Sequence, residues 1–296
     1  MKSDERSGSA WFVVRRRLGA YWKLIKSLQT GLLLMTGLAG YLSAHASVHW
    51  GTLWPLCISL FLAISGSTML NMWWDRDLDA RMKRTHMRPA AAGSVPAVEV
   101  LSLGLVTSAI GIGWAARLNI HYGLAVFAGW FFDVLVYTVW LKRRTCWAIV
   151  WGGIAGAMPI LAGRVLAIDR VDTIGILLAA SVLFWIPTHT LTFSLKFADD
   201  YRAAGVPTFP STYGIGFTRL MIAGSSILAG LTMSTAAVWI GTAEGILALI
   251  VVLSAVLLFL AATAVIRPSD RMNLRLYKYA SIYMLLSMLL LIPAKV

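Results

Sequence analysis

Long apolar runs separated by short polar or basic segments dominate the chain. Nine of these runs are about 17–23 residues long, the length that an α-helix needs to cross a ~30 Å hydrocarbon core. They cover approximately residues 25–45, 52–72, 97–116, 121–141, 146–167, 174–195, 217–240, 245–266 and 276–293. The third and fourth runs are joined by a tight link at residues 117–120. The pattern predicts an all-α, polytopic membrane protein with a bundle of nine transmembrane helices.

Composition agrees with this prediction. Of the 296 residues, 58% are hydrophobic and only 13% are charged, whereas about 25% are charged in a typical soluble domain. No segment outside the runs is long enough to fold separately, so we expect an N-terminal segment at 1–23 and one transmembrane domain at 24–296. Cys57 and Cys146 lie in or beside apolar runs, and two such cysteines support neither a disulfide framework nor a zinc site.

The net charge of +13 is distributed unevenly along the chain. The N-terminal segment up to Lys26 and the regions following runs two, four, six and eight hold 22 of the 26 Lys and Arg residues. Because basic loops stay in the cytoplasm, the split fits nine spans, with the N-terminus in the cytoplasm and the C-terminus outside. Topology thus explains the positive charge, and we expect the lipid bilayer and no nucleic acid as a partner.

The end of the second run carries a string of acidic and amide side chains. Asn71, Asp75 and Asp79 are spaced i, i+4 and i+8 and therefore share one helix face, whereas Asp77 points the other way. Acceptor groups at the mouth of an apolar helix need a positive partner, and Mg²⁺ prefers such oxygen ligands together with phosphate oxygens. Basic residues that suit phosphate follow within one to three turns: Arg81, Lys83, Arg84 and Arg88.

A second acidic pair, Asp199 and Asp200, follows the sixth run and is flanked by Lys196 and Arg202. The predicted topology puts it on the same membrane face as the first motif. Two acidic groups at the mouths of two helices are able to hold a metal-bridged diphosphate. The alternative is a charged juxtamembrane helix with internal ion pairs, and the presence of a second cluster on the same face favours the diphosphate site.

With these motifs the chain resembles the UbiA superfamily of intramembrane prenyltransferases and, within it, the branch of haem O synthases (protoheme IX farnesyltransferases). The resemblance runs from about Leu24 to the C-terminus and rests on four stretches, residues 71–93, 137–145, 152–159 and 199–207. It implies a nine-helix bundle with a cavity open to the membrane, in which Mg²⁺ ions and the two acidic motifs hold an isoprenyl diphosphate. It also implies the cell membrane of a prokaryote, with the active site facing the cytoplasm.

The resemblance implies roles for individual residues. The expected catalytic metal ligands are Asn71, Asp75 and Asp79 for one Mg²⁺ and Asp199 and Asp200 for a second. The expected diphosphate contacts are Arg84, Arg88, Lys142, Arg143 and Lys196, and the expected acceptor-binding residues are His189, Tyr137 and Tyr201. The implied reaction transfers the farnesyl group of farnesyl diphosphate to a vinyl group of haem B through an allylic carbocation, and water adds a hydroxyl to give haem O.

Several positions depart from the pattern of the haem branch. Ala148 stands where Asn is expected, Ile160 where the second of two paired prolines is expected, and Thr208 where Met is expected. Arg164 stands where a Trp is expected near Gly163. None belongs to the acidic motifs, so the reaction type follows more directly from the sequence than the acceptor does. A UbiA-type prenyltransferase with a quinone-ring or lipid precursor as acceptor is the alternative. A transporter is disfavoured because no internal repeat is seen and the acidic groups lie at one membrane face.

Overall fold

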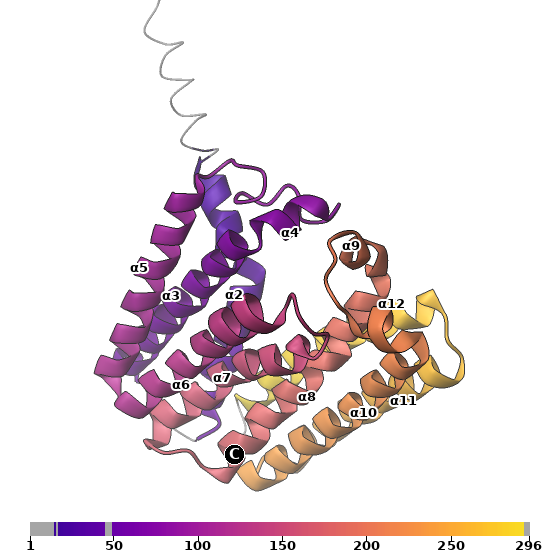
Figure 1. Cartoon of the computed structure of the whole chain (residues 1–296). Coiled ribbons are helices and arrows are strands. Elements are labelled where there is room, and N and C mark those ends of the chain that lie inside the picture. Colours follow the sequence, from indigo (N-terminus) through magenta and orange to yellow (C-terminus); the bar gives the residue numbers. More distant parts are fainter. Residues whose placement is uncertain (1–14, 16, 45–48, 293–296) are drawn as a thin grey trace, which may run out of the picture.

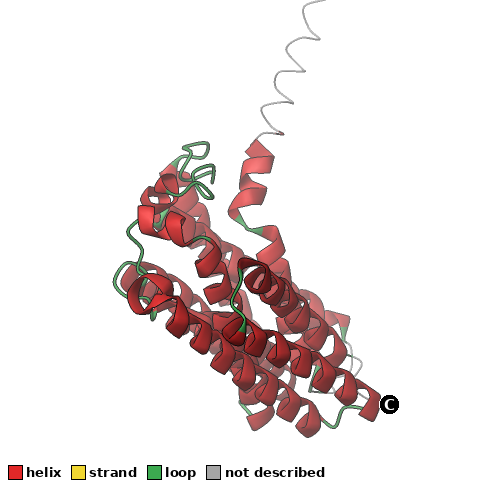
Figure 2. Ribbon diagram, turned by 90° about the vertical axis from the view of Figure 1, so that its right-hand side faces the viewer, coloured by secondary structure: helices red, strands yellow, loops and turns green. Residues whose placement is uncertain are grey.

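The computed structural model describes residues 15, 17–44 and 49–292; residues 1–14 and 16 of the expected N-terminal segment lie outside these ranges. The described residues form helices and loops without a strand (Figures 1 and 2). In chain order the helices are α2 (Ser27–Leu42), α3 (Trp50–Trp74), α4 (Arg76–Arg81), α5 (Ala97–Leu118), α6 (Ile120–Phe131), η1 (Phe132–Leu141), α7 (Ala148–Ile168), α8 (Thr173–Lys196), α9 (Ala198–Ala203), α10 (Phe209–Ile240), α11 (Glu244–Ile266) and α12 (Asp270–Leu291).

Eight helical segments within the described ranges are long and apolar enough to cross a membrane. They are α3, α5, the continuous segment α6–η1, α7, α8, α10, α11 and α12. The first predicted span corresponds to α2, which has only 16 residues because the chain turns at Lys26 before it. The all-α membrane fold is therefore confirmed, and the count of nine spans stays a prediction. Large apolar side chains on the helix flanks, such as Trp54, Leu105 and Phe259, are exposed, as expected for surfaces that face lipid.

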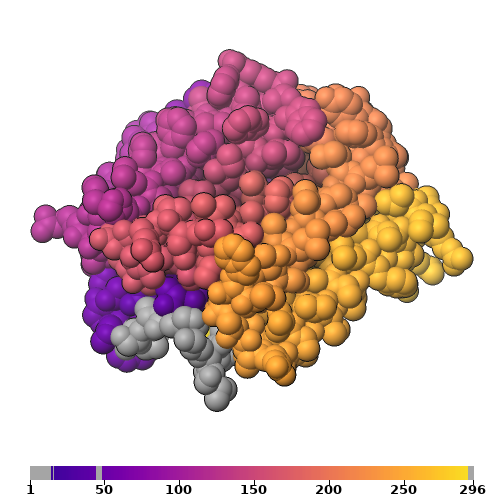
Figure 3. Space-filling view, turned by 90° about the horizontal axis from the view of Figure 1, so that it is seen from below, coloured from indigo at the N-terminus to yellow at the C-terminus, as the bar shows by residue number. Residues whose placement is uncertain are grey.

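Helix α7 is the centre of the bundle. It packs against α2, α6 and α8, while α3 pairs with α5 and α10 pairs with α8 and α11. In Figure 1 the helices from α2 to α6 lie on one side and those from α8 to α12 on the other, and the short helices α4 and α9 face each other at the same end. Figure 3 views the opposite end, where the two halves of the chain lie against each other.

Small residues allow α2 and α7 to approach each other closely. A Cβ atom on Gly40 would lie 2.0 Å from the carbonyl oxygen of Ile160, and one on Gly163 would lie 1.9 Å from that of Gly37. The glycines at the start of α7 behave similarly, because a Cβ on Gly152 would lie 2.7 Å from the ring of Tyr137. Glycine therefore allows α7 to pack closely against both α2 and η1.

The fourth apolar run is not one regular α-helix, which corrects the sequence prediction. From Phe132 to Leu141 the backbone is a π-helix, in which hydrogen bonds join residues five apart. The N–H of Lys142, for example, donates to the carbonyl of Tyr137 at 2.8 Å. The wider turn changes which side chains share a face, and π-helical turns often occur at functional sites.

Arg164 connects helices at the end of the bundle that is remote from the acidic motifs. The residue is 6% exposed, and its guanidinium donates two hydrogen bonds of 2.7 Å to the carboxylate of Asp172, the N-cap of α8. A third bond of 3.0 Å goes to the hydroxyl of Ser43 at the end of α2. A buried charge is tolerated when it is paired and hydrogen-bonded in this way. The residue that departs from the expected Trp therefore joins α2, α7 and α8.

The close contact of α2 with α7 predicts opposite effects for two glycine substitutions in α2. Gly40→Ala should destabilise the folded protein by about 1–3 kcal/mol, because the new methyl group overlaps backbone atoms of Ile160. Gly31→Ala is the control, because nothing lies within 4 Å of its Cβ position, and it should stabilise by up to about 1 kcal/mol. Thermal unfolding in detergent measures both. Equal melting temperatures for the two variants would contradict the close packing.

Candidate active site

The first acidic motif lies at the joint between α3 and α4. The joint is at Asp75 (φ −89°, ψ 7°), and the N–H of Asp79 still donates to the carbonyl of Asp75 at 2.8 Å. The helical phase therefore continues through the joint, and Asn71, Asp75 and Asp79 all line one cavity. Asp77 points away with a side chain that is 47% exposed. The predicted i, i+4, i+8 face is confirmed.

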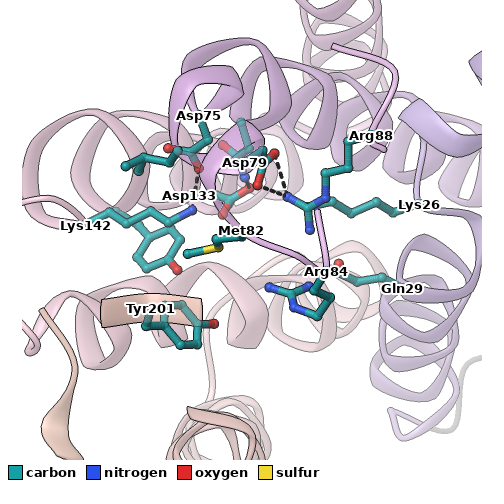
Figure 4. Close-up of a pocket in the computed structure, with 13 residues that line it drawn as sticks. Lys26, Gln29, Asp75, Asp79, Met82, Arg84, Arg88, Asp133, Lys142 and Tyr201 are labelled. Carbon is teal, nitrogen blue, oxygen red and sulfur yellow. Dashed lines mark hydrogen bonds and ion pairs between the residues drawn. The ribbon is translucent and has the colours of Figure 1, made fainter. Parts of the chain in front are cut away.

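The cavity has a volume of about 190 Å³ and lies at the end of the bundle where α4 and α9 face each other (Figures 1 and 4). Its walls come from the start of α2, from α3 and α4 with the loop after them, from η1 and from α9. The lining residues are Lys26, Gln29, Asn71, Asp75, Leu78, Asp79, Met82, Arg84, Arg88, Asp133, Tyr137, Lys142 and Tyr201. The lining thus combines three carboxylates with four cationic side chains.

The two buried carboxylates of the motif are paired with cations (Figure 4). Nη1 of Arg88 lies 2.8 and 2.9 Å from the two oxygens of Asp79, and Nζ of Lys142 donates to Oδ2 of Asp75. The Asp79 and Asp75 side chains are only 5% and 3% exposed. The remaining oxygen of Asp75, Oδ1, is buried without a hydrogen-bond partner, and Nη2 of Arg143 is 3.9 Å from it.

Asp77 and Arg143 form a pair on the outer side of α4. The guanidinium lies 2.7 and 2.9 Å from the carboxylate oxygens. These hydrogen bonds from Arg143 hold the pKa of Asp77 below its usual value. Because both side chains are at least one third exposed, the pair contributes little to stability. Arg143, expected to contact diphosphate, does not line the cavity.

The second acidic motif lies on α9 at the same end of the bundle. Oδ2 of Asp200 accepts a hydrogen bond of 3.3 Å from the backbone N–H of Arg84, and Arg84 lines the cavity. Asp199 is 95% exposed and pairs with Arg202 at 3.1 Å. Neither aspartate lines the cavity, and neither does Lys196. Within the described ranges, no three His, Cys, Asp or Glu side chains are grouped closely enough to hold a metal ion.

The structure adds three polar residues that the sequence analysis did not select. Lys26, Gln29 and Asp133 line the cavity. Lys26 has φ 45°, in the left-handed region that is unfavourable for residues with a Cβ, and such strain is common at functional sites. In the sequence pattern, Lys26 stands out only as one of the basic residues that indicate a cytoplasmic N-terminus. Asp133 had a usable signal, because an acid within a membrane span is a functional candidate by default.

Tyr137 and Tyr201, two expected acceptor-binding residues, stand between two cavities. They line the main cavity and also a smaller one of about 50 Å³. The smaller cavity is walled largely by apolar residues, including Leu191, Val206 and Phe209. The polar cavity therefore shares part of its wall with an apolar one, which is lined partly by residues of α8.

His189, the third expected acceptor-binding residue, lines neither cavity. Its ring is stacked between those of Trp185 and Tyr277, with centroids 5.0 and 4.7 Å away. Nδ1 lies 3.2 Å from the hydroxyl of Ser281 on α12. Phe193 near the end of α8 and Phe197, which follows the helix, continue the aromatic row with centroids 4.5 Å apart.

Arg84 connects this aromatic row to the main cavity. Its guanidinium carbon lies 4.9 Å from the ring centroid of Phe193 and 5.6 Å from that of Phe197, distances at which a cation is attracted to an aromatic face. Phe193 in turn lies 5.9 Å from Tyr277, which stacks on His189. A row of rings therefore leads from the charged cavity towards the middle of α8.

Comparison with known proteins agrees with this geometry. Residues 33–288 match the UbiA prenyltransferase family. The chain is 40% identical over 268 residues to the protoheme IX farnesyltransferase of Archaeoglobus fulgidus, covering 90% of this chain and 94% of the relative. It is 36% identical over 276 residues to the protein of that name from Pyrobaculum neutrophilum, covering 93% and 99%.

Solved structures share the fold. One described as digeranylgeranylglyceryl phosphate synthase superposes with a TM-score of 0.79 at 16% identity, covering 94% of this chain and 98% of the other. A UbiA homologue from Archaeoglobus fulgidus, bound to GPP and Mg²⁺, superposes with a TM-score of 0.69 at 16% identity, covering 92% and 99%. The sequence match covers most of the chain and the helix arrangement agrees with it: this chain belongs to the UbiA prenyltransferase family.

Proposed function

We propose that the protein transfers the farnesyl group of farnesyl diphosphate to a vinyl group of haem B, which gives haem O. The observation that carries the proposal is the cavity in which buried Asp75 and Asp79 lie among Lys26, Arg84, Arg88 and Lys142. This lining suits a metal-bound diphosphate. The choice of haem B is supported by the relatives named protoheme IX farnesyltransferase. We further propose that this cavity faces the cytoplasm.

The cationic side chains have donors left for a diphosphate. Arg88 uses only Nη1 for Asp79, so Nη2 and Nε remain available among the five N–H donors of a guanidinium. Lys142 gives one of its three protons to Asp75. These groups are able to hold phosphate oxygens without giving up their carboxylate partners, which keeps the buried charges compensated.

The oxygen atoms of the motif fit a hard divalent cation. Asp75 presents a buried carboxylate oxygen that lacks a hydrogen-bond partner, and such an atom is costly unless a cation is near it. In the proposal Asn71, Asp75 and Asp79 hold one Mg²⁺. Asp199 and Asp200 of α9 are the proposed ligands of a second, because Asp200 already contacts the backbone of Arg84 in the cavity wall. Bound Mg²⁺ neutralises charge on the departing diphosphate.

The reaction begins when the bond between C1 of the farnesyl group and the diphosphate oxygen breaks, and the electron pair leaves with the diphosphate. Arg84, Arg88 and Lys142 are positioned to stabilise the negative charge that develops on it. The π electrons of the vinyl group then form the new carbon–carbon bond. Water adds to the resulting cation and loses a proton. Apolar side chains of the smaller cavity exclude water from the allylic cation before the acceptor reaches it.

We propose that His189 binds the acceptor. The hydroxyl of Ser281 donates its only proton to the carbonyl of Tyr277 at 3.0 Å, so it accepts from Nδ1–H of His189. Nε2 then carries the lone pair, and no described residue hydrogen-bonds to it. Histidines that ligate metals are commonly oriented through the other ring nitrogen in this manner. Tyr137 and Tyr201, between the two cavities, are the proposed contacts on the farnesyl side of the acceptor.

The function is tested with purified protein, Mg²⁺ and farnesyl diphosphate. Haem B, a quinone-ring precursor and a lipid precursor are offered as separate acceptors, and mass spectrometry identifies the products. We expect a product from haem B with the mass of haem O. If another acceptor were prenylated while haem B was left unchanged, the protein would still be a prenyltransferase, but haem B would not be its acceptor.

The two faces of α4 predict different effects for two aspartates of one motif. Asp79→Asn should lower turnover by about 100-fold or more, because it removes a charge from the cavity at the point where Arg88 binds. Asp77→Asn should lower it only slightly, because Asp77 faces solvent with Arg143. Initial rates of prenyl transfer at saturating Mg²⁺ measure both. Equal losses in the two variants would show that the cavity is not the reaction site.

The hydrogen bond between His189 and Ser281 predicts how substitutions change the absorption spectrum of bound haem B. Wild-type protein should shift the absorption spectrum of haem B, and His189→Ala should abolish the shift while farnesyl diphosphate binding is almost unchanged. Ser281→Ala keeps the imidazole but removes the acceptor of Nδ1–H, so it should weaken the shift only in part. Identical haem spectra and product yields for wild type and His189→Ala would mean that the histidine has a structural role.

A further inference from the structure

Asp133 belongs to a polar network that joins η1 to α3 beneath the main cavity. Its Oδ2 accepts a hydrogen bond of 2.9 Å from Nδ2 of Asn71 and another from the hydroxyl of Ser67. Thr138, fully buried, lies 2.7 Å from Oδ1 of Asn71 and 2.8 Å from the carbonyl oxygen of Asp133. The side-chain amide of Asn71 is thus held at both of its ends.

The π-helix brings this network into the cavity. Lys142 is nine positions after Asp133, which corresponds to about 2.5 turns of an α-helix and would put the two side chains on opposite faces. In η1 the hydrogen bonds join residues five apart, so each turn contains more residues than a turn of an α-helix. Nine positions then correspond to about two turns. Asp133 and Lys142 therefore share a face, and both line the cavity.

The charge of Asp133 determines the orientation of Asn71. A carboxylate accepts hydrogen bonds and cannot donate them, so only the NH₂ end of the amide is able to face it. The carbonyl oxygen, the one atom of an Asn side chain that binds a metal ion, is then directed away from Asp133, and it has a second lone pair besides the one that faces the Thr138 hydroxyl. With a Leu at 133 only Thr138 would hold the amide, and its hydroxyl, which also reaches the carbonyl oxygen of Asp133, is able to accept from an NH₂ group as well as donate. The amide would then be free to reverse, and its NH₂ group would oppose a cation.

We propose that Asp133 is a positioning residue, which fixes the Asn71 amide so that its carbonyl oxygen faces the cation that accompanies the diphosphate. The inference rests on the proposed function, since it concerns the same site. It assigns a role to an acid that belongs to neither acidic motif. It also explains why an acid is kept within an apolar span, where an ionised group without partners is unfavourable.

The test measures metal binding apart from catalysis. Electron paramagnetic resonance follows the binding of Mn²⁺, a substitute for Mg²⁺, to purified protein with farnesyl diphosphate and without an acceptor. We expect Asp133→Leu to weaken Mn²⁺ binding by about 10-fold or more, as is typical when a supporting residue of a metal ligand is removed. Asp133→Asn retains an acceptor oxygen for Nδ2, but its own NH₂ group also fits a reversed Asn71 amide, so it should recover only part of the affinity. Ser67→Ala, which removes the other donor to Asp133, is the matched control and should have little effect.

A double-mutant cycle with Asn71→Ala tests whether Asp133 acts through Asn71. If it does, Asp133→Leu should change Mn²⁺ affinity strongly in the wild-type background and hardly at all in Asn71→Ala. Additive losses, or unchanged Mn²⁺ affinity in a folded Asp133→Leu protein, would overturn the positioning role. Wild-type protein that binds no Mn²⁺ in the presence of farnesyl diphosphate would instead overturn the proposed function, so the two failures are distinguishable.

Discussion

Burial of two carboxylates at the mouth of a membrane bundle is the constraint on which the site depends. Asp75 and Asp79 are almost inaccessible, and an ionised carboxylate in such a position is stable only with a cation and hydrogen bonds around it. Lys142 and Arg88 supply the charge from η1 and from the loop after α4. Three separate parts of the chain must therefore meet at one point, and their meeting creates a cavity that is polar inside an otherwise apolar protein.

The bundle supplies what these charges need. Helix α7 carries α2 on one side and α8 on the other, and the contact of Gly40 with the backbone of Ile160 draws α2 inward. The start of α2 then brings Lys26 to the edge of the cavity. At the opposite end, the buried pair of Arg164 with Asp172 joins the same helices. Contacts outside the cavity thus join the helices that carry parts of its wall.

A charged cavity and a mostly apolar cavity share three lining residues. The main cavity is lined by charged groups, while the smaller one, which shares Tyr137, Lys142 and Tyr201 with it, is mostly apolar. A substrate with an anionic head and an isoprenoid tail matches this sequence of environments. The aromatic row from Arg84 to His189 extends the apolar side towards the middle of α8. In our proposal, the charged head of one substrate and the apolar body of the other are held at the two ends of this path.

The sequence by itself determined the membrane-helical fold and the face of the first motif, because both follow from local periodicity. Asn71, Asp75 and Asp79 share a face in any helix, and Asp77 cannot join them. The residues that complete the cavity were decided only by tertiary structure. Lys26, which lines it, has a left-handed backbone just before α2, and Asp133 reaches it because the wider turn of η1 rotates it onto the face of Lys142. Neither a local backbone strain nor a change of helix type is encoded in an apolar run, since both depend on the neighbours against which that run packs.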